Sequence, residues 1–289
     1  MTRLAEIEAQ IGSMADLLGI VGAMRSLAGM RRQEAVRALP DVRGYAGDMA
    51  AAIADVFLLL PQPAAPAGGG RGRRAVVLFL AEHGFVGGFS ERLIEVARAR
   101  AKPRDVLMIL GSRGAAQAVE HGLPAAWTSP APTRSAGAVE AARRVADELY
   151  RRIARDGIDR VEMVYARYRA QGGPAAEIRT LLPIDPEPLR LKGWGQAPMH
   201  NLDPATLLEM LVAEYVFAQL TEAAVESIAS ENETRLTTME AARDNVSKKL
   251  ERLRQTARHA RQAEITTELL DLVTGADALQ SPASSGRSL

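Results

Sequence analysis

Residues 205–274 read ATLLEMLVAEYVFAQLTEAAVESIASENETRLTTMEAARDNVSKKLERLRQTARHARQAEITTELLDLVT and contain neither proline nor glycine. Asp203-Pro204 precedes this stretch and Gly275 follows it, which is the usual punctuation of a helix start and a helix end. A single helix over these 70 residues would be roughly 105 Å long at about 1.5 Å per residue. Because helices in globular proteins average about 11–12 residues, we expect a rod around which the rest of the chain is organised.

Both ends of the chain carry the apolar spacing of a coiled coil, in which steps of three and four residues alternate. The C-terminal seam is expected at Leu236, Met239, Val246, Leu250, Leu253, Ala257 and Ala260, with Arg243 filling a skipped position. The N-terminal seam is expected at Leu4, Ile7, Ile11, Met14, Leu18, Val21, Arg25 and Ala28. The alternative for the N-terminal stretch is an amphipathic helix on a globular core, but alternation over about three heptads favours a coiled coil. We therefore predict an antiparallel pair of helices.

The pattern also predicts where the helical ends of the chain begin and stop. The N-terminal coiled-coil helix is expected over residues 1–60, with Pro40 kinking or ending its first part, so that Tyr45 to Leu60 is a continuation or a second piece. The C-terminal coiled-coil helix is expected over residues 203–279. Residues 61–74 have the proline and glycine content of a linker, and residues 280–289 form a small, polar tail that we expect to be disordered.

Residues 75–190 have the pattern of an α/β domain inserted between the two helices. Strands are expected at Ala75–Ala81, Asp105–Gly111, Arg160–Arg169 and Glu177–Ile184, and helices at Ser90–Ala101, Gly114–His121 and Ala136–Asp156. Alternation of strands and helices implies a partly parallel sheet covered by helices. The last two strands are joined by Gly172-Gly173-Pro174 and are expected to form an antiparallel hairpin at one side. The predicted fold class is therefore α/β, with a Rossmann-like domain and a coiled coil.

Composition excludes several kinds of function. The 36 basic and 35 acidic residues nearly cancel, so the overall charge does not favour nucleic acid or an anionic membrane as a partner. The sequence has no cysteine and four scattered histidines, so we expect no disulfide, no metal site and no cofactor. No charged-then-apolar signal opens the sequence, and no uninterrupted apolar run approaches about 18 residues. We therefore expect a soluble protein with no direct membrane insertion.

Residues Glu82–Ser90 (EHGFVGGFS) lie between the first predicted strand and its helix, where phosphate-binding loops often occur. The stretch is neither GxGxxG nor a Walker loop, because no Lys-Ser or Lys-Thr follows the glycines. His83 is the best single candidate for acid–base chemistry, but no carboxylate or nucleophile is visibly placed to pair with it. We favour a tight strand-to-helix turn and predict no catalytic residue.

Two parts of the long C-terminal helix are candidates for contacts with partners. The first, the basic collar, consists of Arg243, Lys248, Lys249, Arg252, Arg254 and Arg258. It is either a solvated helix face or a cationic surface held by an acidic partner, and nucleic acid is less favoured because aromatic residues are not interleaved with the basic ones. The second, the apolar tip, consists of Ile265, Leu269, Leu270, Leu272 and Val273. An exposed apolar helix end that no intramolecular partner can cover indicates a protein contact.

Taken together, these residues resemble the γ subunit of rotary F-type ATP synthases. The resemblance is strongest in ARQAEITTEL at residues 260–269 and in Val273-Thr274-Gly275-Ala276. Further matching residues are Ser230-Glu231, Arg235-Leu236, Met239, Ala242, Asn245, Ile20-Val21, Ala23-Met24, Gly84 and Gly87-Gly88-Phe89. Glu82-His83 stands where the family usually has an Asp-Arg pair, and Pro40 interrupts the first helix, which together indicate a divergent branch.

The resemblance implies a central shaft that couples ion-driven rotation to conformational changes at the catalytic β subunits and is not itself an enzyme. It implies as partners the ring of α and β subunits, an ε subunit and a membrane c-ring, at the cytoplasmic face of the bacterial inner membrane. By residue-wise carry-over, Arg261, Gln262, Thr266 and Glu268 would meet catch loops of the β subunits. Met24 and Arg25 would lie in the lever region, and Ile265 to Leu279, which include the apolar tip, would turn in an apolar bearing. The alternative function is a coiled-coil scaffold unrelated to ATP synthesis.

Overall fold

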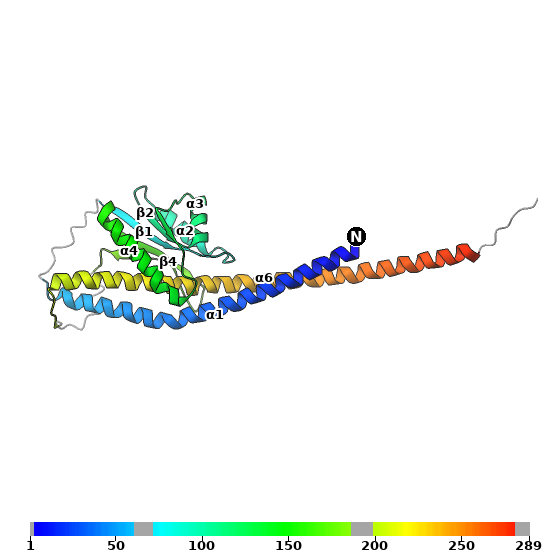
Figure 1. Ribbon diagram of the computed structural model, residues 1–289, viewed down its shortest axis with the longest axis horizontal. Coiled ribbons are helices and arrows are strands. Elements are labelled where there is room, and N and C mark those ends of the chain that lie inside the picture. Colours follow the sequence, from blue (N-terminus) through cyan, green and yellow to red (C-terminus); the bar gives the residue numbers. More distant parts are fainter. Residues whose placement is uncertain (1–2, 61–71, 186–198, 281–289) are drawn as a thin grey trace, which may run out of the picture. The chain divides into compact units, whose positions relative to one another are not determined.

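The computed structural model describes residues 3–60, 72–185 and 199–280 (Figure 1). Two long helices, α1 (Arg3–Phe57) and α6 (Pro204–Gln280), stand at the two ends of the described chain, and a five-stranded sheet is formed between them in sequence. The chain divides into two compact units. The helical unit comprises residues 1–24 and 239–289, and the mixed unit comprises residues 25–238. The expected linker and tail lie largely outside the described residues.

The sheet belongs to the mixed unit and has the strand order β3-β2-β1-β4-β5. Its strands are β1 (Arg73–Phe79), β2 (Val106–Leu110), β3 (Trp127–Ser129), β4 (Ile158–Arg167) and β5 (Ala175–Leu182). The first four are parallel to their neighbours, and β5 pairs antiparallel with β4. The predicted partly parallel sheet with a terminal hairpin is therefore confirmed. β3 was not predicted, because a strand of three residues is too short to show an alternating pattern.

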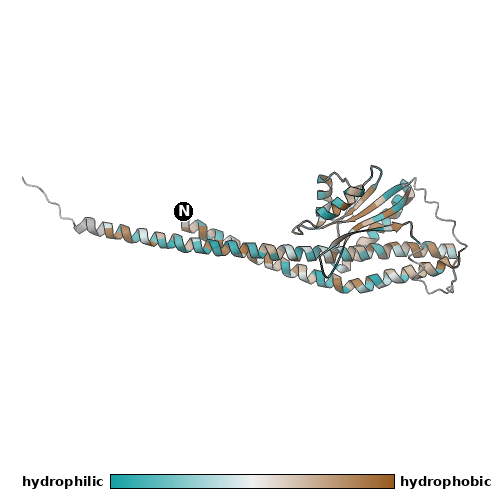
Figure 2. Ribbon diagram, turned by 180° about the vertical axis from the view of Figure 1, so that it is seen from behind, coloured by the Kyte–Doolittle hydropathy of each residue, from teal (hydrophilic) through white to brown (hydrophobic). Residues whose placement is uncertain are grey.

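The side chains of β1 alternate between two apolar cores, as expected for a strand that is covered on both faces. Ala75, Val77 and Phe79 point into a core formed with α4 (Ala138–Asp156), α6 and α1. Val76 and Leu78 point into the opposite core, which is formed with α2 (Phe89–Arg100) and α3 (Ser112–Glu120). A short 3-10 helix, η1 (Ser135–Gly137), leads into α4. Figure 2 shows the strands as mainly hydrophobic and the two long helices as mixed, which fits helices that bury one face.

α1 is one helix of 55 residues that continues through Pro40. The prediction that Pro40 could end the helix is therefore wrong, and the residues after Tyr45 continue it as far as Phe57. Proline leaves the carbonyl four residues earlier without its helical donor. Because Pro40 is exposed, water can reach that side of the helix, while the buried Leu39 and Ala46 hold the other side against the core.

α6 likewise continues beyond Gly275 to Gln280, so that glycine does not mark its end. Glycine inside a helix costs about 1 kcal/mol relative to alanine. A helix that has already been propagated over many residues tolerates that cost, since each further residue adds one hydrogen bond without a new nucleation step.

In the mixed unit α1 and α6 run antiparallel, because later residues of α1 meet earlier residues of α6. Tyr45 donates a hydrogen bond from its hydroxyl to Glu214, and Arg32 Nη1 lies 2.7 Å from Glu233 Oε2. A third apolar cluster forms where the helices meet near the end of α1. It contains Ala50, Ile53 and Ala54 with Leu208, Leu211, Val212 and Tyr215 packed against them. The predicted antiparallel arrangement is thus observed.

A glycine substitution tests the packing of β1 against β2. Gly111 has a φ of +115°, and a Cβ there would lie 2.3 Å from the carbonyl oxygen of Leu80. We expect Gly111→Ala to lower the free energy of unfolding by about 3 kcal/mol or more, because backbone strain and steric overlap act together. The matched control is Gly122→Ala, where φ is +77° and nothing lies within 4 Å of the added atom. Its cost should stay at about 1–2 kcal/mol. Urea denaturation of both variants would contradict this account if the two losses were equal.

Candidate partner-binding surface

The helical unit consists, in its described residues, of the first turns of α1 and the last part of α6. Exposure along α1 follows the predicted heptads: Ile7 is 8% exposed, whereas Ile20, which lies between seam positions, is 58% exposed. On α6, Met239 and Leu250 are buried, and Leu253, Ala257 and Ala260 are half-buried. This periodicity confirms the coiled-coil spacing of both chain ends.

The structure corrects one position of the predicted seam. The side chain of Arg243 is exposed, whereas Ala242 is half-buried. Ala242 lies three residues after Met239 and four before Val246, so the seam takes two steps of three and then two of four between Leu236 and Leu250, and the strict alternation is interrupted there. An alanine there avoids the cost of burying a guanidinium group.

The basic collar is exposed throughout. Within the described residues, Arg258 is the only member with an ion pair, 3.5 Å from Glu251. The other members are Arg243, Lys248, Lys249, Arg252 and Arg254. Three of them, Lys248, Lys249 and Arg252, line a shallow hollow together with Asn245, Leu253 and Thr256. Apart from Arg258, the collar therefore presents positive charge that no ion pair of the described residues neutralises.

The four residues expected to meet catch loops are also exposed on α6. Arg261 Nη2 lies 2.9 Å from Glu8 Oε1 of α1, so an ion pair joins the two helices within the helical unit. Thr266 donates a hydrogen bond from its hydroxyl to the carbonyl of Gln262 at 2.8 Å. Glu268 lines an open hollow beside Leu4 at the start of α1. Arg261 and Glu268 are seven residues apart and share one face of the helix, and Gln262 and Thr266 share the neighbouring face.

Met24 and Arg25, the predicted lever residues, are adjacent and half-buried on α1. The boundary between the helical unit and the mixed unit falls between them. On α6 the corresponding boundary falls between Thr238 and Met239.

The apolar tip is uncovered. All five side chains are between 50% and 70% exposed: Ile265, Leu269, Leu270, Leu272 and Val273.

α1 also contains a stretch long and apolar enough, with a mean hydropathy of 1.3, to cross a membrane by length and composition alone. That finding differs from the expectation based on uninterrupted apolar runs, because the stretch includes small and polar residues. One such helix is weak evidence for a membrane span, and its seam residues Ile7 and Val21 are buried in the coiled coil.

The turn at Glu82–Ser90 packs against α6 in the mixed unit. A Cβ at Gly87 would lie 3.3 Å from Thr238 Oγ1, and Arg235 Nη2 lies 3.5 Å from the carbonyl oxygen of Gly84. In nucleotide-binding α/β proteins a phosphate lies at this end of the first strand. Here α6 packs on the loop itself, which supports the interpretation as a tight turn.

Glu82 has a structural role that the sequence reasoning missed. Its carboxylate accepts hydrogen bonds from the Ser112 amide at 3.0 Å, the Ser112 hydroxyl at 2.8 Å and the Ala131 amide at 2.8 Å. Burial raises the pKa of Glu82, but these hydrogen bonds outweigh it and hold the pKa below its usual value. The signal was its place three residues after the end of β1, near the edge where the carboxyl ends of parallel strands meet. His83 is exposed.

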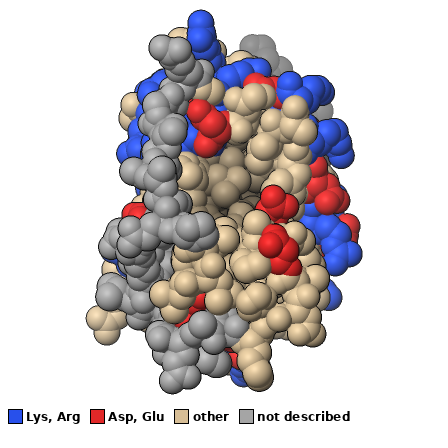
Figure 3. All heavy atoms as spheres, turned by 90° about the vertical axis from the view of Figure 1, so that its left-hand side faces the viewer, with Lys and Arg blue, Asp and Glu red and all other residues tan. Residues whose placement is uncertain are grey.

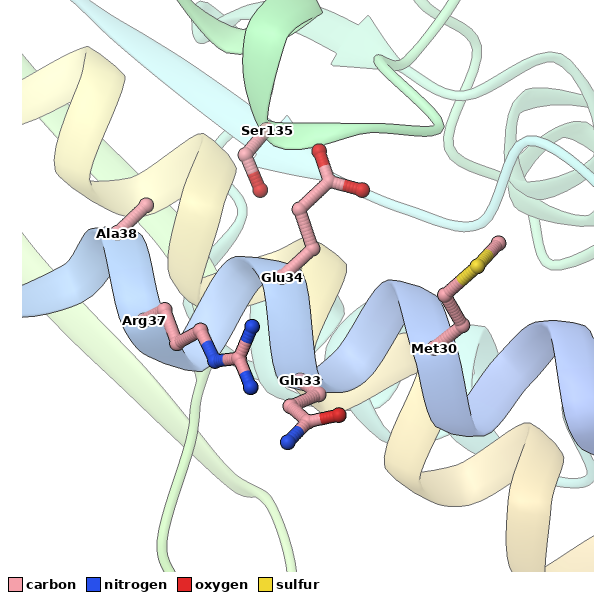
Figure 4. Close-up of a pocket in the computed structure, with 6 residues that line it drawn as sticks. All are labelled: Met30, Gln33, Glu34, Arg37, Ala38 and Ser135. Carbon is pink, nitrogen blue, oxygen red and sulfur yellow. The ribbon is translucent and has the colours of Figure 1, made fainter.

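Two further surfaces of the mixed unit were not predicted. An open groove is lined by Met30, Gln33, Glu34, Arg37 and Ala38 of α1 and by Ser135 of η1. Figure 4 shows Glu34 extending from α1 toward Ser135. The second surface, the end surface, lies where α1 ends and α6 begins, and Figure 3 shows mainly uncharged residues across the middle of this face. Its exposed apolar side chains include Leu58, Met199, Leu202 and Met210.

Comparison with known proteins gives one consistent result. A family model described as ATP synthase matches residues 3–279. The ATP synthase gamma chain of Gemmatimonas aurantiaca is 30% identical over 297 residues, covering 97% of this chain and 100% of that protein. The ATP synthase gamma chain of Paracoccus denitrificans is 28% identical over 294 residues, covering 96% of this chain and 100% of that protein.

Solved structures agree with the fold. A chain of the Euglena gracilis mitochondrial ATP synthase, from its OSCP/F1/c-ring structure, matches with a TM-score of 0.69 at 13% identity and covers 99% of both chains. A chain from the rotor structure of the same assembly matches with a TM-score of 0.63 at 15% identity, over 91% of this chain and 98% of that one. The predicted combination of long terminal helices and an inserted α/β domain is confirmed.

The heptad seam can be tested by truncating one of its buried residues. We expect Leu250→Ala to lower the free energy of local opening around residues 246–257 by about 2–4 kcal/mol, because the change removes apolar contacts and leaves a cavity. Arg254→Ala, at an exposed position on the same helix, should change it by no more than about 0.5 kcal/mol. Amide hydrogen exchange of the full chain measures both values. Equal protection in the two variants would show that Leu250 is not a seam residue.

Proposed function

This chain belongs to the ATP synthase gamma chain family, and on that premise we propose that it is the central-stalk subunit of an F-type ATP synthase. In this role it turns inside a ring of α and β subunits and is not itself catalytic. The observation that carries the proposal is the C-terminal part of α6, where the exposed basic collar is followed by an exposed apolar tip. Both surfaces suit burial inside a surrounding protein ring.

An asymmetric shaft can couple rotation to catalysis because it touches three like sites of the ring differently. To move one site from almost entirely one conformation to almost entirely another takes about 5.5 kcal/mol of differential binding. A few charge-assisted hydrogen bonds together with apolar contacts are sufficient for this. Coupling free energy is reciprocal, so ion-driven rotation favours release of ATP and ATP hydrolysis drives the shaft in the opposite direction.

The contacts with catch loops of the β subunits are assigned to Arg261, Gln262, Thr266 and Glu268. Arg261 pairs with Glu8 in the free chain, and both side chains are at least half exposed. Exposed ion pairs contribute about 0–1 kcal/mol, so exchanging Glu8 for an acidic group of the ring costs little. Met24 and Arg25 are proposed as the lever, and the apolar tip as the part that turns in the bearing.

Partners of the mixed unit are proposed to be the membrane c-ring and an ε subunit. The end surface, with the exposed Leu58, Leu202 and Met210, supports a protein contact there. The complex would then place this chain peripherally, at the cytoplasmic face of the bacterial inner membrane. The exposed apolar residues of α1 would face the ring rather than lipid. The coiled-coil scaffold is not favoured, because the family match includes the sheet as well as the helices.

The catch-loop assignment is tested in complex reconstituted from this chain and the α and β subunits, bound to its membrane sector in vesicles. We expect Arg261→Ala with Gln262→Ala to assemble and to hydrolyse ATP, while ion transport per ATP falls at least tenfold. Gln255→Ala, at an exposed position of the same helix outside the assigned residues, serves as the control and should keep normal coupling. Failure of the unaltered chain to assemble would refute the function, and normal coupling in the double variant would refute only the assignment.

A further inference from the structure

A row of buried polar side chains runs along one face of α6 where it crosses the β4–β5 hairpin in the mixed unit. The row consists of Gln219, Glu222, Glu226 and Ser230, spaced three or four residues apart. Glu226 and Ser230 are both 0% exposed. Burying such groups costs free energy unless each one is hydrogen-bonded, so their partners indicate what the row does.

Every member of the row binds the hairpin. Arg179 of β5 donates from Nη1 to Gln219 Oε1 at 2.5 Å and to Glu222 Oε2 at 3.0 Å. The Tyr168 amide, directly after β4, donates to Glu226 Oε2 at 2.7 Å. The Ser230 hydroxyl donates to the carbonyl oxygen of Ala166 in β4 at 2.9 Å. Three turns of α6 are thus hydrogen-bonded to two strands.

The two carboxylates of the row also bind α1. Arg43 of α1 donates from Nη2 to Glu226 Oε1, and its Nε lies 4.0 Å from Glu222 Oε1. Each carboxylate therefore has α1 on one side and the hairpin on the other. Glu222 and Glu226 join three elements that are far apart in sequence.

Arg179 is itself held in position. Its Nη2 donates to Glu177 Oε1 at 2.8 Å, and its guanidinium carbon lies 5.3 Å from the centre of the Tyr165 ring. Burial raises the pKa of Glu177, but hydrogen bonds from Tyr165, Arg179 and Arg167 outweigh it and hold the pKa below its usual value. The partner of Arg179 on the strand thus stays charged at neutral pH.

Apolar packing alone would leave α6 freer to move on the sheet. The contacts of Val216 and Leu220 in the core are non-directional, whereas hydrogen bonds require defined distances and angles. A buried ion pair adds little net stability, because desolvation offsets its Coulomb energy. The row is therefore better explained by the geometry that it fixes than by the stability that it adds.

Resting on the function proposed above, we propose that Glu222 and Glu226 are positioning residues that lock the angle of the α1–α6 pair against the sheet, so that torque passes between them. The helices would carry the load from the ring, and the sheet would carry it from the membrane rotor. Without the lock, α6 would roll on its apolar contacts and part of the rotation would be lost.

The lock is tested first in the isolated full chain by distances between spin labels. The chain has no cysteine, so labels at Arg98→Cys on α2 and Thr237→Cys on α6, both exposed, are unique. We expect Glu222→Gln with Glu226→Gln to broaden the distance distribution at least twofold. The matched control is Glu233→Gln, which removes the 2.7 Å pair with Arg32 between the two helices. It should leave the distribution unchanged, because this pair does not involve the sheet.

The same variants are then measured in the reconstituted complex. We expect the double variant to lose at least half of the ion transport per ATP and the control to lose none. An unchanged distance distribution would overturn the lock, and a broadened distribution with normal coupling would overturn its role in torque. If the double variant does not fold, Ser230→Ala, which removes one hydrogen bond of the row, replaces it with the same expected direction. Failure of the unaltered chain to assemble would refute the proposed function instead.

Discussion

The structure depends on the burial of one apolar face of α1 against one apolar face of α6. A helix of 55 residues and a helix of 77 residues gain little from propensity alone, and most helical stability in proteins comes from packing of such a face. The heptad spacing supplies that packing in the helical unit, where no strand is present among the described residues. In the mixed unit the same helices also pack on a sheet. Each long helix therefore has a surface suited to a partner helix in one part of its length and a surface suited to a sheet in another.

The sheet and its loops hold α6 in place within the mixed unit. In the mixed unit α6 contacts the loop that follows β1, through Thr238 beside Gly87 and Arg235 beside the carbonyl oxygen of Gly84. The hairpin then fastens α6 through the buried carboxylates of Glu222 and Glu226. The α/β domain thereby holds part of the helix pair in place, which agrees with a stalk that transmits force.

The sequence predicted the elements whose signal is periodic and missed those whose signal is local. The heptads placed Ile7, Leu250 and their neighbours correctly because burial repeats along the helix. Pro40 and Gly275 were given too much weight, since packing and propagation outweigh a single unfavourable residue in a long helix. Arg243 was placed in the seam because strict alternation after Met239 leads to position 243, whereas the structure exposes Arg243 and half-buries Ala242. The partner contacts of Arg261 and the basic collar depend on chains outside this one, so they remain predictions.

The central claim is that this chain is the rotating central stalk of an ATP synthase. The most direct measurement is to fix a complex of this chain with α and β subunits to a surface and follow a probe attached at a cysteine introduced at Arg98, which is exposed on α2. The account predicts continuous rotation of the probe in one direction when ATP is added, and none without ATP. A complex that assembles and hydrolyses ATP while the probe stays still would contradict it.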